Sequence, residues 1–247
     1  RAPTDLARSM SSRIAMFRAI SSRESPLVPW PRRRLALASG LASRKNLYFA
    51  SGKTTVVRLL LDFTHATSGT LSIDGISSKD PVCRASVGYL SENPRIPPNL
   101  TGWQYLQRCS ELLGMSRLEA VSHIGDIVER IGMRGREHTK ARTYSRGMIQ
   151  RFGLGAALIG NPKLLILDEP TAGLDPIGIR EVRRILESFK GQGMTVLLNS
   201  HLLSEVEKIC DTAAIINSGR LLLKDSIPSI IRDGETLEDV FVRLVKG

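Results

Sequence analysis

Two thirds of the way along, the chain reads Leu164-Leu165-Ile166-Leu167-Asp168-Glu169-Pro170. Four aliphatic residues without polar alternation predict a strand buried on both faces of a parallel sheet. Asp168 and Glu169 then stand at the carboxyl end of that strand, where open α/β sheets bind ligands. Adjacent carboxylates repel each other unless a positive group lies close by. A Mg²⁺ ion held against nucleotide phosphates would supply it, and a solvated acidic turn is the alternative.

A second buried strand is predicted at residues 195–200, and His201 follows it directly. Parallel strands end at the same edge of a sheet, so we expect His201 near Asp168. A lone histidine is more often structural than functional. Its place after a parallel strand favours the functional interpretation.

A partial phosphate loop is predicted by Ala50-Ser51-Gly52-Lys53-Thr54-Thr55, which precedes an apolar, helix-like run. It matches the second half of the pattern G-x-x-x-x-G-K-[ST]. Backbone amides and the helix N-terminus surround the phosphates in such a loop. Lys53 would reach the β- and γ-phosphates, and the Thr54 hydroxyl would hold Mg²⁺. Leu47 and Ala50 stand where glycines are expected and could crowd the phosphate, so an ordinary helix start is the alternative.

A capped helix is predicted after Tyr144, in the run Tyr144-Ser145-Arg146-Gly147-Met148. Ser145 suits the N-cap position, and Gly147 allows a ligand to approach the helix N-terminus closely. The segment therefore predicts an anion-binding helix end. An ordinary capped helix is the alternative.

The remaining pattern predicts an α/β fold with a mainly parallel sheet and a small helical subdomain inserted between strands. Strands are expected at 70–75 and 87–90, helices at 101–132 with a break at Gly114, at about 176–190 and at 236–245, and a closing hairpin at 213–217 and 220–224. Glu92 follows the strand at 87–90. We place the helical subdomain at about 92–160.

The basic character of the chain belongs to its first segment. Residues 1–46 hold nine Arg and one Lys against Asp5 and Glu24, and the other residues carry only +3 of the formal +11. We therefore expect no nucleic-acid partner for the folded part. Three interpretations of 1–46 as an atypical basic tail remain open: translation from a wrong start or frame, a disordered arm, or an organellar targeting segment.

Two further features bound the class of protein. Cys83, Cys109 and Cys210 are scattered without C-x-x-C spacing, which argues against a disulfide framework or a zinc site and suits a reducing compartment. The sequence holds no apolar run of the length that crosses a bilayer. We therefore expect that the chain does not span a membrane by itself.

Taken in this order, the motifs from about residue 50 to the end resemble the ATP-binding subunit of an ABC transporter, in the form common among export-type (ABC-2-like) members. SGKTT is similar to a truncated Walker A motif, LLILDEP to a Walker B motif and YSRGM to the family signature. GLDP, which contains Asp175, resembles the D-loop, and Ser200-His201 resembles the switch histidine. The resemblance implies a P-loop NTPase-type domain over 47–247.

The resemblance implies roles for these residues. Glu169 and His201 would be catalytic, with Glu169 polarising the attacking water and His201 fixing its geometry. Thr54 and Asp168 would hold Mg²⁺. Nucleotide contacts are expected from Ser51, Gly52, Lys53, Thr54, Thr55 and Glu92, and, toward the ATP of an opposite subunit, from Ser145, Gly147 and Asp175.

Departures from the family pattern accompany these matches. Glu92 stands where the family usually has a glutamine, and Arg146 and Met148 replace a glycine and a glutamine of the signature. The strands and the adenine-stacking aromatic residue that normally precede Walker A are not recognisable in 1–46, so we expect the N-terminal strands to be absent or disordered.

The resemblance implies ATP hydrolysis that powers an exporter. The subunit would act peripherally at the cytoplasmic face of the cell membrane, with ATP and Mg²⁺ as cofactors. Its expected partners are transmembrane permease subunits and a second ATP-binding subunit. The alternative is a nucleotide-binding-defective remnant with a damaged phosphate loop. A soluble ABC ATPase of DNA repair or translation is disfavoured, because the chain holds one cassette and no basic folded surface.

Overall fold

The computed structural model describes residues 53–189, 192–217 and 219–246, without the side chains of Lys53 and Thr54. The tail at 1–46 and the predicted ligands Ser51 and Gly52 lie outside the described residues. The described chain divides into two compact units, one formed by 53–85 with 212–246 and the other by 86–211.

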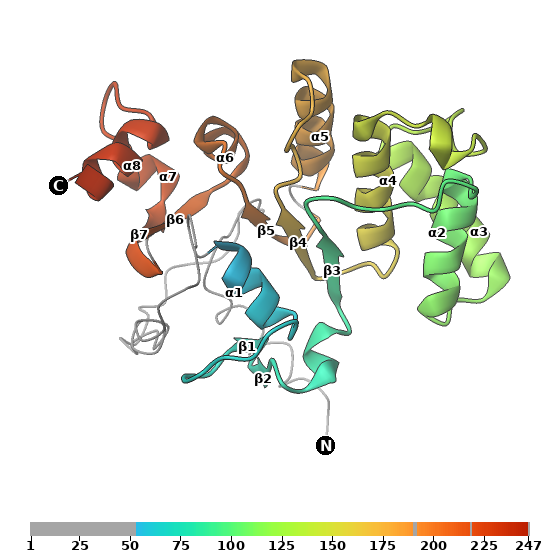
Figure 1. Cartoon of the computed structure of the whole chain (residues 1–247), viewed down its shortest axis with the longest axis horizontal. Helices are drawn as coiled ribbons and strands as arrows, with labels where there is room; N and C mark the ends of the chain where they lie inside the picture. The colour runs from blue at the N-terminus through green and yellow to red at the C-terminus, as the bar shows by residue number, and fades with distance from the viewer. Residues whose placement is uncertain (1–52, 190–191, 218, 247) are drawn as a thin grey trace. The chain divides into compact units, whose positions relative to one another are not determined.

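The unit at 86–211 is built on a parallel sheet. Its strands are β3 (Val87–Leu90), β4 (Leu164–Asp168) and β5 (Thr195–Asn199), in the order β3-β4-β5 (Figure 1). All five residues of β4 are buried, and Asp168 lies in register with Asn199. The predicted doubly buried central strand is therefore confirmed, and β3 and β5 match their predicted positions.

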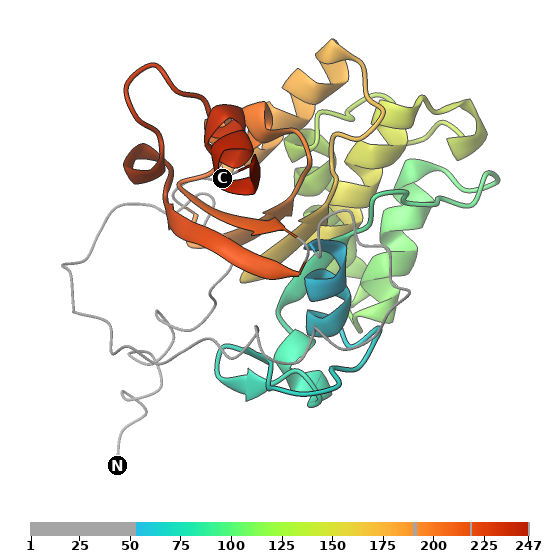
Figure 2. The ribbon, with the colours of Figure 1, turned by 60° about the vertical axis from the view of Figure 1, so that its left-hand side comes forward.

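Three helices lie between β3 and β4 in sequence: α2 (Gly102–Leu112), α3 (Arg117–Arg130) and α4 (Arg146–Leu158), with the 3₁₀ helix η2 (Ala141–Thr143) before α4 (Figure 2). The predicted helical segment breaks at Gly114, whose φ of 75° is left-handed. Reciprocal capping boxes, Thr101 with Gln104 and Ser116 with Glu119, begin α2 and α3. The helices predicted between these two strands are therefore present.

Helix α4 packs against β3 through small residues. A Cβ built at Gly88 would lie 2.1 Å from the carbonyl oxygen of Ala157, and one at Gly153 would lie 2.9 Å from Leu90 Cδ1. Glycine at both positions lets the helix and strand backbones approach closely. The wholly buried Phe152 and Leu154 on α4 join the apolar core of this unit.

Two more helices complete this unit. Helix α5 (Pro176–Ser188) follows β4, and the short α6 (Leu203–Ile209), which the sequence pattern did not predict, follows β5. Arg183 joins them by donating from Nε and Nη2 to Glu205, at 2.8 and 2.7 Å. Such a bidentate interaction pairs the two opposite charges and also fixes the relative position of the two helices.

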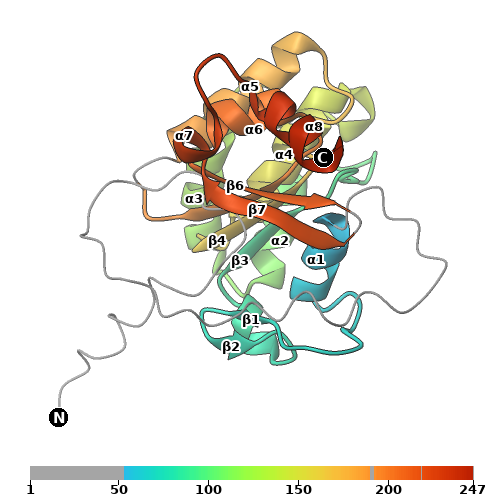
Figure 3. The same ribbon diagram turned by 90° about the vertical axis from the view of Figure 1, so that its left-hand side faces the viewer.

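The unit formed by 53–85 and 212–246 contains α1 (Lys53–Leu60), β1 (Ser72–Ile73), β2 (Ile76–Ser77), η1 (Pro81–Arg84), β6 (Thr212–Asn217), β7 (Arg220–Ser226), α7 (Ile227–Ile230) and α8 (Leu237–Lys246) (Figure 3). The predicted hairpin is the antiparallel pair β6-β7. The strand expected at 70–75 is only two residues long, because Asp74 and Gly75 turn back at φ of 51° and 81° to form β1-β2.

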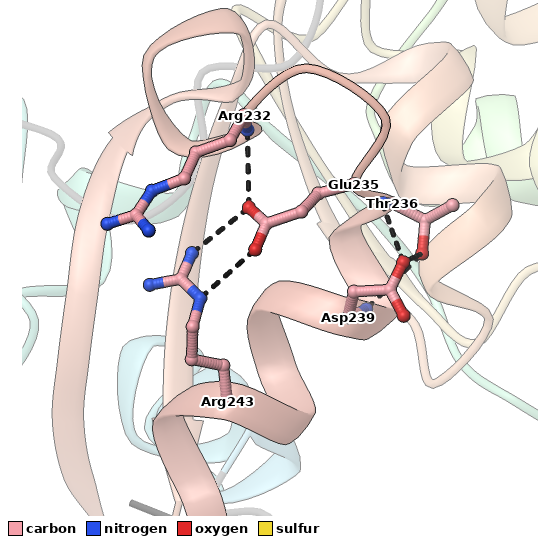
Figure 4. A network of polar contacts seen from close by, with 5 residues as sticks. All are labelled: Arg232, Glu235, Thr236, Asp239 and Arg243. Atoms are coloured by element: carbon pink, nitrogen blue, oxygen red, sulfur yellow. Dashed lines mark hydrogen bonds and ion pairs between the residues drawn. The ribbon is translucent and has the colours of Figure 1, made fainter.

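Helix α8 begins with a polar network (Figure 4). The Asp239 carboxylate accepts from the Thr236 amide at 2.9 Å and hydroxyl at 2.6 Å, and these bonds lower the pKa of Asp239. Glu235 accepts from Arg243 at 3.2 Å. The predicted terminal helix is therefore present with its own cap. Across the described residues, no helix combines the length and the apolar character needed to span a membrane.

Candidate active site

The carboxyl edge of the β3-β4-β5 sheet carries the predicted acidic pair. Asp168 ends β4 and is 4% exposed, and its carboxylate accepts a hydrogen bond from the side-chain amide of Asn199 at the end of β5. The parallel register sets the two residues side by side. Sequence reasoning missed Asn199, although its position directly before Ser200-His201 could have indicated it.

The environment of Asp168 disfavours its negative charge. The pKa of Asp168 is raised, and burial is the largest cause. The hydrogen bond from Asn199 lowers the pKa, and the negative charges of Glu169 and Glu92 raise it. Among the side chains that the structure describes, no basic group contributes to this balance. A buried carboxyl with two acidic neighbours fits a bound cation, because a cation would relieve both the burial and the repulsion.

The donor set also limits the kind of cation. Within the described residues, no group of three or more His, Cys, Asp or Glu side chains could hold a metal ion alone. Mg²⁺ is commonly held by one or two carboxylates together with phosphates and water. Asp168 therefore fits an ion that arrives with nucleotide phosphates.

We expect Asp168→Asn to raise the free energy of unfolding at pH 7 in the absence of metal. The raised pKa means that the folded protein binds the proton more tightly than the unfolded chain, so stability declines as pH rises from the unfolded pKa through the folded one. The gain should shrink at pH 4, where the carboxyl protonates. Urea unfolding in EDTA at both pH values measures it, with the exposed Asp126→Asn as control. A less stable variant at pH 7 would contradict this explanation.

Glu169 and His201 form a direct pair at the same edge. His201 Nδ1 lies 2.7 Å from Glu169 Oε2, and the His201 backbone amide donates to the same oxygen at 3.2 Å. The Glu169 amide in turn donates to the Asn199 carbonyl at 2.8 Å. The prediction that strand 195–200 brings His201 to the edge that holds Asp168 is confirmed.

Glu169 adopts an unusual backbone conformation. Its φ of 50° is left-handed, which costs a residue other than glycine about 1 kcal/mol or more. Pro170 follows it and disfavours the right-handed helical region for the preceding residue. The turn stops β4 abruptly and leaves the Glu169 carboxylate, only 14% exposed, against the more accessible His201. Backbone strain of this kind is concentrated at active sites and ligand-binding turns.

The predicted N-cap of α4 is confirmed. Ser145 has extended backbone angles, and its Oγ accepts from the Met148 amide at 3.3 Å. The hydroxyl can still donate its own proton. Gly147 follows within the first turn and is only partly exposed. The first amides of an α-helix have no partner within the helix, and together with the Ser145 hydroxyl they are the groups that an anion site needs.

Tyr144 anchors the start of α4, and sequence reasoning did not identify it. Its ring stacks on Phe152 with centroids 5.0 Å apart. Its hydroxyl donates toward the carbonyls of Arg136 and Thr139, at 3.0 and 2.9 Å, and accepts from the Gly102 amide at 2.9 Å. These contacts tie Ser145 to the start of α2 and to the segment before η2.

Asp175 and Glu92 lie on loops of the same unit. Asp175 is the N-cap of α5 and accepts from the Gly178 amide at 2.7 Å, so it has a structural role whatever else it contacts. Glu92 is exposed after β3, and its charge contributes to the raised pKa of Asp168. Glu92 is thus electrostatically part of the acidic site.

The phosphate-loop residues belong to the other unit. The backbone of Lys53 and Thr54 begins α1, and Thr55 is half-buried. The expectation that SGKTT leads into a helix is met from Lys53 onward. That Lys53 and Thr54 meet the same triphosphate as Asp168 remains a prediction.

Comparison with known proteins gives concordant matches. A family model described as "ABC transporter" matches residues 50–172. An ABC transporter ATP-binding protein of Nostoc sp., described as uncharacterized, is 39% identical over 75% of this chain and 56% of its own length. The lantibiotic transport ATP-binding protein SrtF of Streptococcus pyogenes is 38% identical over 77% of this chain and 80% of its own length. The chain thus spans little more than half of the Nostoc relative.

Solved structures agree in fold. The ATP-binding subunit of an ABC transporter is 27% identical, with a TM-score of 0.69 over 78% of this chain and 83% of the solved one. A dimeric ATP-binding cassette in a post-hydrolysis state with ADP and Pi is 20% identical, with a TM-score of 0.63 over 71% and 81%. The predicted α/β fold with its parallel sheet is confirmed by both.

Proposed function

Because the chain belongs to the ABC transporter family, we propose that it is an ATP-binding subunit that hydrolyses ATP to power an export-type transporter. The observation that supports this most directly is the edge of the β3-β4-β5 sheet. There a buried aspartate, a glutamate and a histidine lie together. That the ligand is ATP is inferred from the family, and the roles of the three residues are inferred from their positions at this edge.

Glu169 is the proposed base. Its Oε2 is held by His201 Nδ1 and by the His201 amide, so the carboxylate has a fixed direction. A positioned carboxylate can accept a proton from water as that water attacks phosphorus. His201 acts as a second contact that keeps Glu169 and the terminal phosphate in register. The cost of the left-handed backbone at Glu169 is consistent with this role.

Residues of both the SGKTT and the LLILDEP motifs are proposed to hold Mg²⁺ and the phosphates. Asp168 would hold Mg²⁺ directly or through water, with Thr54 as a further ligand and Lys53 on the β- and γ-phosphates. Bound Mg²⁺ would neutralise charge that develops on the phosphate oxygens. Ser51, Gly52, Thr55 and Glu92 would complete the nucleotide contacts. The raised pKa of Asp168 supports the cation part of this assignment.

A second ATP-binding subunit is proposed as a partner. Ser145, Gly147 and Asp175 lie on two helix starts that can face a nucleotide held by another copy. One chain then supplies half of each site, which matches the dimeric state named for one of its structural relatives. Closure of two subunits around ATP would be the motive step.

Permease subunits are proposed as the membrane-spanning partners, with this chain peripheral at the cytoplasmic face. The name of the Streptococcus pyogenes relative refers to lantibiotic transport, which supports an export role. The loop around Glu92 and helix α2 form the proposed region that transmits closure to the permease. The transported molecule would be recognised mainly by the permease.

His201→Ala tests the proposed site. We expect kcat for ATP hydrolysis to fall about 100-fold, because a misplaced Glu169–water pair loses most of its orientation benefit. ATP affinity should change much less. Steady-state phosphate release with Mg²⁺ measures this, and the exposed His65→Ala is the matched control. An alanine variant with the parental kcat would contradict the assigned role of His201.

A further inference from the structure

The guanidinium of Arg146 packs against Gly173, in the turn that joins Glu169 to Asp175. A Cβ built at Gly173 would lie 2.6 Å from Arg146 Cζ and 2.8 Å from Nη1. The guanidinium therefore fills the space that any other residue at 173 would need. Gly173 also has a left-handed φ of 67°, which only glycine adopts without strain.

The same guanidinium reaches the loop after β3. Arg146 Nη2 donates to Asn93 Oδ1 at 3.4 Å, and Asn93 directly follows Glu92. Two turns further along α4, a Cβ built at Gly153 would lie 2.8 Å from Pro94 Cβ. Residues seven apart share one helix face. This face of α4 therefore contacts the Glu92 loop at two points.

We propose that Arg146 is a positioning residue that ties the start of α4, with Ser145, to the Glu92 loop and to the 169–175 turn. The inference rests on the proposed function. Both contacts lie within its own unit. In the proposed function the phosphate is bound by Ser145 and Gly147, so the role inferred for Arg146 is separate from phosphate binding. A glycine at position 146, as the family signature usually has, could make neither contact.

Two backbone hydrogen bonds within the 169–175 turn can show whether the Arg146 contacts stabilise it. The Ala172 amide donates to the Glu169 carbonyl at 3.1 Å, and the Leu174 amide donates to the Thr171 carbonyl at 3.2 Å. If Arg146 holds the turn, its removal allows both bonds to open more often. Glu169 begins this turn, so the loss also loosens the proposed base. A small displacement of such a group lowers the rate of the chemical step.

The first test is amide hydrogen exchange on the nucleotide-free full chain. We expect Arg146→Ala to speed exchange at Ala172 and Leu174 several-fold. The control Arg117→Ala, an exposed arginine at the start of α3, should leave both unchanged. Unchanged exchange in the Arg146 variant would overturn the proposal. This readout needs no ATPase activity, so an inactive parent protein would refute the proposed function and still leave the tie testable.

The second test separates a positioning role from a general loss of stability. Arg146→Ala should lower kcat about tenfold with little change in KM for ATP, and Arg146→Lys should recover part of that loss. Gly173→Ala should cost at least about threefold less in kcat when Arg146 is already alanine, because the steric conflict is then gone. An unchanged kcat, or independent effects of the two substitutions, would overturn the role in catalysis.

Discussion

Glu169→Gln is expected to lower kcat for ATP hydrolysis by about 100-fold or more, because an amide cannot accept the proton of the attacking water. Substitutions of exposed residues on the surface helices should lower kcat much less. The amide oxygen of the variant can still accept from the His201 backbone amide, so the turn after β4 should keep its shape. Phosphate release under saturating Mg-ATP measures the loss.

The same variant should still bind ATP. Glu169 acts on water, and the proposed nucleotide contacts lie on other residues. If hydrolysis is what separates the paired subunits, the variant should accumulate as an ATP-bound dimer, which size-exclusion chromatography detects. The exposed Glu187→Gln on α5 is the control and should retain parental turnover. A Glu169→Gln protein with parental turnover would refute the assigned base.

Lys53→Ala is expected to weaken Mg-ATP binding by about 10-fold to 100-fold. Charge-assisted hydrogen bonds contribute about 1.5–3 kcal/mol each, and Lys53 is the only lysine in the SGKTT loop. The side chain would carry its charge to the β- and γ-phosphates, so hydrolysis should fall with binding. Calorimetric titration with Mg-ATP measures the change in affinity.

The control for this variant is Lys79→Ala, an exposed lysine of the same unit. Thermal unfolding of both variants separates loss of binding from loss of fold. Retention of parental affinity by the Lys53 variant would remove the phosphate-loop assignment. A parent protein that binds no Mg-ATP would favour the nucleotide-binding-defective alternative, which follows from Leu47 and Ala50 in place of glycines.

Much of the fold follows from local sequence. The unbroken aliphatic run of β4 predicts a strand in the middle of a sheet, where both of its faces are buried. Ser145 was likewise predictable as the N-cap of α4, because its side chain can accept a hydrogen bond from the first turn. The strand predicted at 70–75 from alternating apolar residues was too long, because Asp74-Gly75 turns the chain after two strand residues. Turn chemistry there outweighed the strand pattern.

The site was only partly predictable. Parallel strands alone predict that His201 and Asp168 share an edge, because strand polarity decides it. The Asn199 bond to Asp168, the left-handed Glu169 and the Arg146 contact with Gly173 depend on register and on tertiary approach. No spacing in the sequence encodes these distances. The family resemblance assigned roles to the motif residues but not to Asn199, Tyr144 or Arg146.

One measurement tests most directly whether Lys53 of the SGKTT motif and Asp168 of the LLILDEP motif bind the same ligand. Mg-ATP affinity is measured by calorimetry for the parent, Lys53→Ala, Asp168→Asn and the double variant. If both side chains hold the same Mg²⁺-bound triphosphate, each single variant loses affinity, and the second substitution costs at least about threefold less once the first is present. Independent, fully multiplicative losses, or no loss from Asp168→Asn, would contradict the account.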